Sequence, residues 1–156
     1  MHKLMDNNIT KQDNKAVINF LKTNPIITNN KKVLEFEKKW SKWLGIKYSV
    51  FVNSGSSALF VGIEALNFAE GSEVITPALT FSTTVGCLVK NNLIPVFVDV
   101  EKFSFCIDTD QIEKSITSKT VAILAPNLMG NICEWDKLRK IADKYGLLLI
   151  EDSADT

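Results

Sequence analysis

Hydrophobic residues along the chain fall into short continuous runs, separated by longer segments with helical spacing. The runs are typical of strands buried on both faces of a sheet and predict strands at residues 48–53, 73–77, 94–100, 120–125 and 147–152. Apolar residues between the runs recur every three or four positions and predict helices at residues 56–66, 81–91, 108–116 and 134–145. This alternation predicts an α/β fold with a mostly parallel sheet covered by helices.

The N-terminal region has a different pattern. Residues 1–15 are polar and are predicted to be loose, and a helix is predicted from Lys15 to Lys22. A second, amphipathic helix is indicated by five apolar residues that precede the stop signal Gly45: Val33, Phe36, Trp40, Trp43 and Leu44. We therefore predict an N-terminal arm and helix over residues 1–30 and the main domain over residues 31–156.

Composition excludes several function classes. The 156 residues are 46% hydrophobic, enough for a buried core, and 18 basic residues balance 18 acidic ones. This balance gives no charge footprint for nucleic acid or an anionic membrane. The sequence has no apolar run of about 18 residues and no apolar signal segment, which predicts a cytoplasmic protein. The three cysteines, Cys87, Cys106 and Cys133, form no CxxC pair and His2 is the single histidine, so we predict buried free thiols and no metal site.

The first candidate site follows the strand at residues 48–53. Gly55 permits a tight turn there, and a helix begins at Ser56 and Ser57, whose hydroxyls and free backbone N–H groups could bind a phosphate. The serines could equally serve only as helix caps, and this segment alone does not decide between the two interpretations.

Two further strand ends carry unusual residues. Phe81 could present its ring to a flat aromatic ligand, although taken alone an ordinary core phenylalanine is the better interpretation. Asn127 has the donors and acceptor to bind a polar ligand, although taken alone an Asx turn is the better interpretation.

Asp152 ends the last predicted strand, where an acidic group is costly unless it is paired. An aspartate there could keep a pyridine nitrogen protonated, as pyridoxal phosphate (PLP) requires, or it could cap a helix or form an ion pair. Because the carboxyl ends of parallel strands meet at one edge of the sheet, all these residues could together form a PLP site.

From about Val33 to Thr156 the chain closely resembles the DegT/StrS family of PLP-dependent sugar aminotransferases. The resemblance is carried, in order, by GIKYSVFVNSGSSALFVGIEAL, GSEVITPALTFSTTV, IPVFVDVE and GNICEWDKLRKIADKYGLLLIEDSAD. It implies the fold-type I, aspartate aminotransferase-like architecture and a homodimer. The implied reaction transfers an amino group, typically from glutamate, to a keto sugar carried on a nucleotide in polysaccharide or sugar biosynthesis.

The resemblance also implies roles for individual residues. Ser56 and Ser57 match the pair that holds the PLP phosphate, Phe81 matches the aromatic residue that stacks on the ring, and Asp152 matches the partner of the pyridine nitrogen. Asp155 stands where many members have Gln or His near the ring hydroxyl, and Asn127 stands where many aminotransferases have His. Residues 31–156 would then be the N-terminal portion of the PLP-binding large domain.

Two features keep other activities open. Asp155, together with the segment from Asn127 to Asn131, resembles the branch of sugar 3-dehydratases, in which a histidine replaces the Schiff-base lysine. That lysine is expected beyond Thr156, so no catalytic residue is assigned, and the lysines present lie on solvated helix faces that do not suit the role. A non-catalytic fragment is a further alternative.

The chain is expected to be truncated, because a domain rarely ends directly after a buried strand. The resemblance implies a seven-stranded sheet, whereas five strands are predicted. We therefore expect the chain alone to expose apolar surface and to associate.

Overall fold

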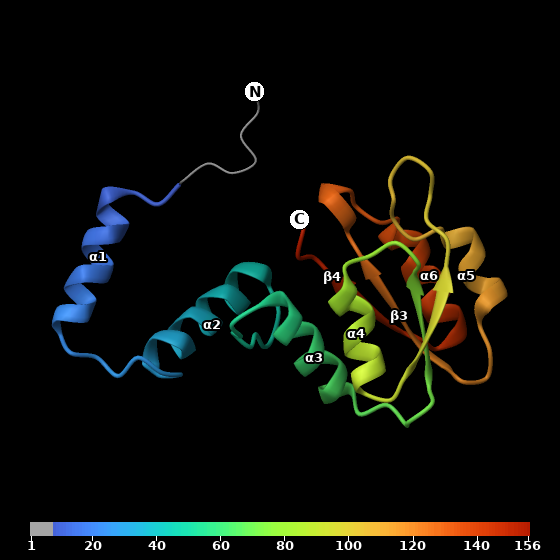
Figure 1. Ribbon diagram of the computed structural model, residues 1–156, viewed down its shortest axis with the longest axis horizontal. Coiled ribbons are helices and arrows are strands. Elements are labelled where there is room, and N and C mark those ends of the chain that lie inside the picture. The colour runs from blue at the N-terminus through green and yellow to red at the C-terminus, as the bar shows by residue number, and fades with distance from the viewer. Residues whose placement is uncertain (1–7) are drawn as a thin grey trace. The chain divides into compact units, whose positions relative to one another are not determined.

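The computed structural model describes residues 8–156, and its chain divides into two compact units (Figure 1). The first unit ends at Phe51, and the second runs from Val52 to Thr156. His2 and most of the predicted polar arm lie outside the described residues. The predicted boundary after residue 30 stays a prediction.

The first unit contains helices α1 (Lys11–Lys22) and α2 (Lys31–Leu44). Helix α1 begins before the predicted Lys15 because Thr10 and Asp13 form a capping box: the Asp13 N–H donates to Thr10 Oγ1 at 3.2 Å, and the Thr10 N–H donates to Asp13 Oδ2 at 2.8 Å. The prediction that residues 11–14 are loose was therefore wrong. Helix α2 ends at Gly45, whose φ of +73° is the left-handed conformation that glycine favours.

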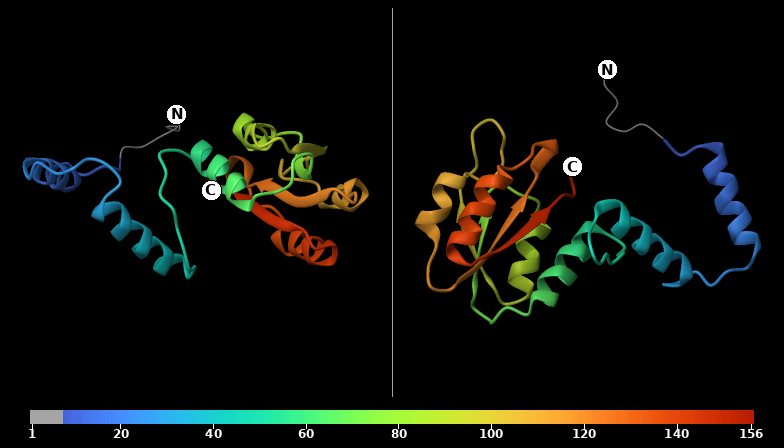
Figure 2. Two further views of the ribbon diagram at one scale, coloured as in Figure 1. Left: turned by 90° about the horizontal axis from the view of Figure 1, so that it is seen from below. Right: turned by 180° about the vertical axis from the view of Figure 1, so that it is seen from behind.

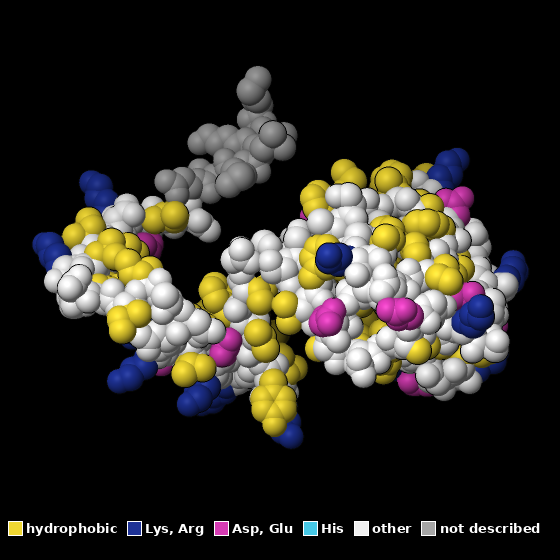
Figure 3. All heavy atoms as spheres, turned by 60° about the horizontal axis from the view of Figure 1, so that its bottom comes forward, with side chains coloured by type: hydrophobic (Ala, Val, Ile, Leu, Met, Phe, Trp, Pro, Cys, Tyr) yellow, Lys and Arg dark blue, Asp and Glu magenta, His cyan; other side chains and the backbone are white. Residues whose placement is uncertain are grey.

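Hydrophobic side chains stay exposed over both helices of this unit (Figure 3). The rings of Phe36 and Trp40 lie 5.8 Å apart, and those of Phe36 and Phe51 lie 5.2 Å apart. All three side chains nevertheless keep 43% or more of their surface accessible. Exposed apolar surface was predicted and is present, whereas association of the chain stays a prediction.

Residues 48–53, predicted as a strand, are not in a sheet. The segment has no regular secondary structure, and the Phe51 N–H donates to Glu37 Oε1 at 2.9 Å instead of to a neighbouring strand. A strand needs a hydrogen-bonded partner, and no other described segment pairs with this one. The described residues therefore contain four strands rather than the five predicted.

The second unit is built on a parallel sheet of β1 (Glu73–Pro77), β2 (Ile94–Val98), β3 (Thr120–Pro126) and β4 (Leu148–Asp152). The strand order is β2-β1-β3-β4, so the chain proceeds outward from β1 to β2 and then crosses to the other side of β1. This reversal places a topological switch point between β1 and β3, where open α/β sheets bind their ligands. The predicted α/β fold with a parallel sheet is confirmed.

Helices cover both faces of the sheet (Figure 2). On one face, α3 (Gly55–Leu66) and α4 (Ser82–Lys90) pack over Val74 and Leu124. On the other face, α5 (Thr109–Ser115) and α6 (Trp135–Tyr145) pack over Ile75 and Ile123. Neighbouring residues of one strand thus enter opposite cores, which explains why the strands are continuous apolar runs in the sequence. None of the helices described in residues 8–156 has the length and apolarity to cross a membrane.

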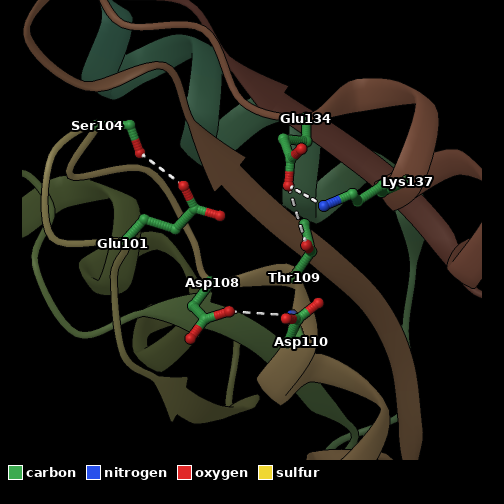
Figure 4. Close-up of polar contacts among 7 residues, drawn as sticks. All are labelled: Glu101, Ser104, Asp108, Thr109, Asp110, Glu134 and Lys137. Atoms are coloured by element: carbon green, nitrogen blue, oxygen red, sulfur yellow. Dashed lines mark hydrogen bonds and ion pairs between the residues drawn. The ribbon is translucent and has the colours of Figure 1, made fainter.

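Polar contacts hold the start of α5 to the start of α6 (Figure 4). Asp108 Oδ1 accepts from the Asp110 N–H at 3.0 Å, so Asp108 is the N-cap of α5. Thr109 Oγ1 donates to Glu134 Oε2 at 3.3 Å, and Lys137 Nζ lies 2.7 Å from the same oxygen. The hydrogen bond from Lys137 lowers the pKa of Glu134. Within the part of the chain that is described, no acidic, cysteine or histidine cluster could hold a metal ion.

All three cysteines are free and buried, as predicted. Burial raises the pKa of Cys87 to about 11. Burial, and then the neighbouring Cys106, raise the pKa of Cys133 to about 12. An unfolded thiol has a pKa of 9.0, so above pH 9 the unfolded chain loses protons that the folded chain keeps.

The free energy of unfolding should therefore fall as the pH rises from 9 towards 11, which urea titrations at each pH would measure. The fall should become smaller when Cys87 and Cys133 are both replaced by alanine. An equal fall in the double variant would contradict the assigned pKa shifts.

Candidate functional site

A pocket of about 230 Å³ opens at the carboxyl ends of β3 and β4, next to the N-termini of α3 and α4. Thr80 and Phe81, which follow β1, also line it, so the pocket adjoins the topological switch point between β1 and β3. Five of the six predicted site residues line it: Ser56, Phe81, Asn127, Asp152 and Asp155. Ser57 is the predicted residue that does not.

The start of α3 separates the roles of its serines. Ser54 is the N-cap, and its Oγ accepts from the Ser57 N–H at 3.1 Å. Ser57 Oγ donates to Asn53 Oδ1 at 2.7 Å, so this hydroxyl belongs to the capping network. Ser56 faces the pocket, with a long hydrogen bond of 3.3 Å to Thr83 Oγ1. The helix thus has a dedicated cap, and Ser56 remains available for a ligand at the positive end of the helix.

The start of α4 supplies a second wall of the pocket. Phe81 precedes α4 and is 66% exposed, so the interpretation as a core phenylalanine is wrong. Thr80 also lines the pocket, and its buried Oγ1 has no hydrogen-bond partner. A buried hydroxyl without a partner is costly, and a ligand acceptor at this position would satisfy it.

Asp152 ends β4 at the opposite side of the pocket. Its Oδ2 accepts from Thr84 Oγ1 at 2.9 Å, and its Oδ1 accepts from the Ala154 N–H at 3.2 Å. Among residues 8–156 no lysine or arginine forms an ion pair with it. The ion-pair interpretation is therefore not supported, and the carboxylate is available to a cationic group of a ligand.

Asn127 has a different environment from the one predicted. Its side chain is 2% exposed, and its amide donates to Glu151 Oε1 at 2.7 Å. Its Oδ1 accepts from the Cys133 N–H at 3.0 Å and from Trp135 Nε1 at 3.1 Å. These partners lie too far along the chain for an Asx turn, and they leave the amide one free N–H. Asn127 therefore fixes the loop between β3 and α6.

Asp155 contacts that same loop. Its Oδ2 accepts from the Met129 N–H at 3.0 Å, within the short 3₁₀ helix η1 (Leu128–Gly130). Met129 has a φ of +56°, a left-handed conformation that is uncommon for a residue other than glycine. The hydrogen bond that Asp155 Oδ2 accepts from Met129 helps to stabilise this conformation, so the two segments define one rim of the pocket.

The donor set fits a phosphorylated heteroaromatic ring such as PLP. Two helix N-termini with Ser56 and Thr83 suit a phosphate group, Phe81 offers a ring face, and Asp152 offers a carboxylate. Sequence reasoning missed the hydroxyls of Thr80, Thr83 and Thr84, although the run TFSTT at a helix start was a signal for them. No lysine among the described residues lines the pocket.

The model of the DegT/DnrJ/EryC1/StrS aminotransferase family matches residues 7–156. A GDP-4-keto-6-deoxy-D-mannose 3-dehydratase of Yersinia pseudotuberculosis is 39% identical over 84% of this chain and 35% of its own length. A 3-oxo-glucose-6-phosphate:glutamate aminotransferase of Bacillus subtilis is 39% identical over 76% of this chain and 27% of its own length.

A solved Escherichia coli structure has the same fold. It is GDP-4-keto-6-deoxy-D-mannose-3-dehydratase with bound hydrated PLP, with a TM-score of 0.88 and 33% identity over 96% of this chain and 40% of that chain. Its cofactor agrees with the one predicted from the sequence. The chain spans about a third of the length of the curated relatives, with 38%, 33% and 35% coverage of three of them.

Proposed function

Because the chain belongs to the DegT/DnrJ/EryC1/StrS aminotransferase family, we propose that its protein is a PLP-dependent aminotransferase acting on a nucleotide-linked keto sugar. The amino donor is glutamate, which the name of the Bacillus subtilis relative includes. The observation that carries the proposal is the pocket itself, in which a carboxylate and two helix N-termini with hydroxyl groups surround a space for a phosphorylated ring.

In this proposal, each group in the pocket has one task. Ser56 and the start of α3 bind the phosphate, with Ser57 keeping the helix start in shape, and Phe81 packs on the ring. Asp152 would accept a hydrogen bond from the pyridine N–H, and PLP would supply an electron sink for the amino transfer. Asp155, which accepts from the Met129 N–H, would face the ring hydroxyl, and Asn127 fixes the loop that contains Met129.

Sugar 3-dehydration is the second candidate. It is favoured by the contact between Asp155 and the Met129 N–H, which joins the two segments that resemble the dehydratase branch, and by the Yersinia relative. The binding tasks of the residues above are the same for both reactions. The reactions differ in whether an amino group is gained or a hydroxyl group is lost.

The remaining assignments follow from the same proposal. Residues 31–156 form the N-terminal portion of a PLP-binding large domain, and residues 1–30 form an arm and helix. The protein works as a cytoplasmic homodimer in polysaccharide or sugar biosynthesis. The residue that binds PLP covalently lies outside the 156 residues.

An assay of the full-length protein with PLP, ¹⁵N-glutamate and GDP-4-keto-6-deoxymannose tests the proposal. We expect ¹⁵N to appear in an amino sugar, with one 2-oxoglutarate released for each amino group transferred. Loss of the C3 hydroxyl without ¹⁵N incorporation would instead establish the dehydratase. A protein that neither binds PLP nor changes the sugar would contradict both candidates.

A further inference from the structure

We infer that Thr84 is a positioning residue for Asp152, an inference that rests on the proposed function. Thr84 lies in the first turn of α4 and Asp152 ends β4, and the hydrogen bond of 2.9 Å between them spans 68 positions of the sequence. Thr84 is fully buried. Its hydroxyl therefore cannot exchange this acceptor for bulk water without local opening.

The Thr84 hydroxyl and the Ala154 N–H, which both donate to Asp152, constrain the position of its carboxylate in different ways. The Ala154 N–H is two residues away and moves together with the strand end. Thr84 belongs to another element, so its bond fixes the carboxylate relative to α4. Phe81 directly precedes that helix and lines the pocket. The hydrogen bond from Thr84 therefore also fixes the Asp152 carboxylate relative to Phe81.

The carboxylate keeps capacity for a ligand after these bonds. Its two oxygens offer about four acceptor positions, of which the Thr84 hydroxyl and the Ala154 N–H use two. A ligand N–H can occupy one of those that remain. Without the Thr84 hydroxyl, the carboxylate would be free to rotate and would lose a charge-assisted hydrogen bond.

Substitution of Thr84 separates the hydroxyl from the shape of the side chain. Thr84→Val keeps the volume and removes the donor, whereas Thr84→Ser keeps the donor and removes a methyl group. We expect PLP to bind about 10-fold more weakly to Thr84→Val, and Thr84→Ser to restore most of the affinity. Equilibrium dialysis of the purified protein with PLP measures both.

A second measurement distinguishes positioning from a general structural role. With PLP labelled at the pyridine nitrogen, the ¹⁵N shift at pH 7.5 reports its protonation. We expect the protonated fraction to fall in Thr84→Val and to recover in Thr84→Ser. A change in packing alone would not produce this pattern.

Thr76→Val is the matched control, because Thr76 is also fully buried but its Oγ1 has no hydrogen-bond partner. This variant should leave both the affinity and the ¹⁵N shift unchanged. Wild-type affinity and shift in Thr84→Val would overturn the inference and leave the proposed function intact. If the wild-type protein fails to bind PLP, both the proposed function and this inference about Thr84 would be overturned.

Discussion

Replacing Asp152 with alanine is expected to weaken PLP binding by about 100-fold. The variant removes the carboxylate that faces the pocket and leaves the buried Thr84 hydroxyl without its acceptor. Under the proposed function it also removes the charge that would keep the pyridine nitrogen protonated, so the bound ring should lose its proton at neutral pH. Equilibrium dialysis against PLP gives the affinity, and a ¹⁵N label on the ring gives the protonation.

Two further variants sharpen this test. Asp152→Asn keeps the shape of the side chain and an oxygen that can accept from Thr84, so it should lose the ring proton while retaining more affinity than Asp152→Ala. Asp136→Ala removes an exposed aspartate in the first turn of α6 and should bind PLP as the wild type does. Wild-type affinity in Asp152→Ala would show that the ring nitrogen does not bind there.

The second large effect concerns the stability of the sheet that carries the site. Ile123→Ala should lower the free energy of unfolding by about 3 kcal/mol, because it deletes part of a fully buried side chain and leaves a cavity between β3 and the α5–α6 layer. Leu124→Ala should cost a similar amount on the opposite face, against α3 and α4. Urea unfolding followed by circular dichroism measures both.

Ile132→Ala is the corresponding control, because Ile132 is 61% exposed and its replacement should change the free energy by less than about 0.5 kcal/mol. A loss for Ile123→Ala but none for Leu124→Ala would mean that only one face of the sheet is tightly packed. That result would contradict the arrangement of two helical layers.

The fold of the second unit could be predicted because its signals are local. Buried strands must be apolar on both faces, and their periodicity differs from that of helices, so the four strands from β1 to β4 were predicted. The same rule wrongly predicted a strand at residues 48–53. An apolar run indicates that a segment can be buried, but a strand also needs a neighbouring strand to pair with, and none of the described segments pairs with this one. The early start of α1 depended on a capping box, Thr10 with Asp13, that the prediction did not weigh.

The site could be predicted only in part, for a related reason. The rule that ligands gather at the carboxyl ends of strands located the pocket and five of its lining residues. Thr84 was missed because its partner is 68 positions away, and no local pattern relates the two. Ser56 and Ser57 are adjacent residues of the same type, and only the directions of their side chains distinguish them. Ser56 lines the pocket, whereas Ser57 belongs to the capping network of α3.

The two outer strands of the sheet differ in their capacity to accept another strand. The Ile94 N–H donates to Ser72 O at 2.9 Å, towards β1, so the nitrogen of the next residue, Pro95, faces outward from β2. Proline has no N–H to offer, and β2 is thereby protected against addition of a strand. On β4, Leu149 and Glu151 direct ordinary backbone groups outward, because the Asp152 carbonyl accepts from the Asn127 N–H towards β3. Addition of a further strand is therefore favoured past β4, the strand that carries Asp152, over the edge that carries Pro95.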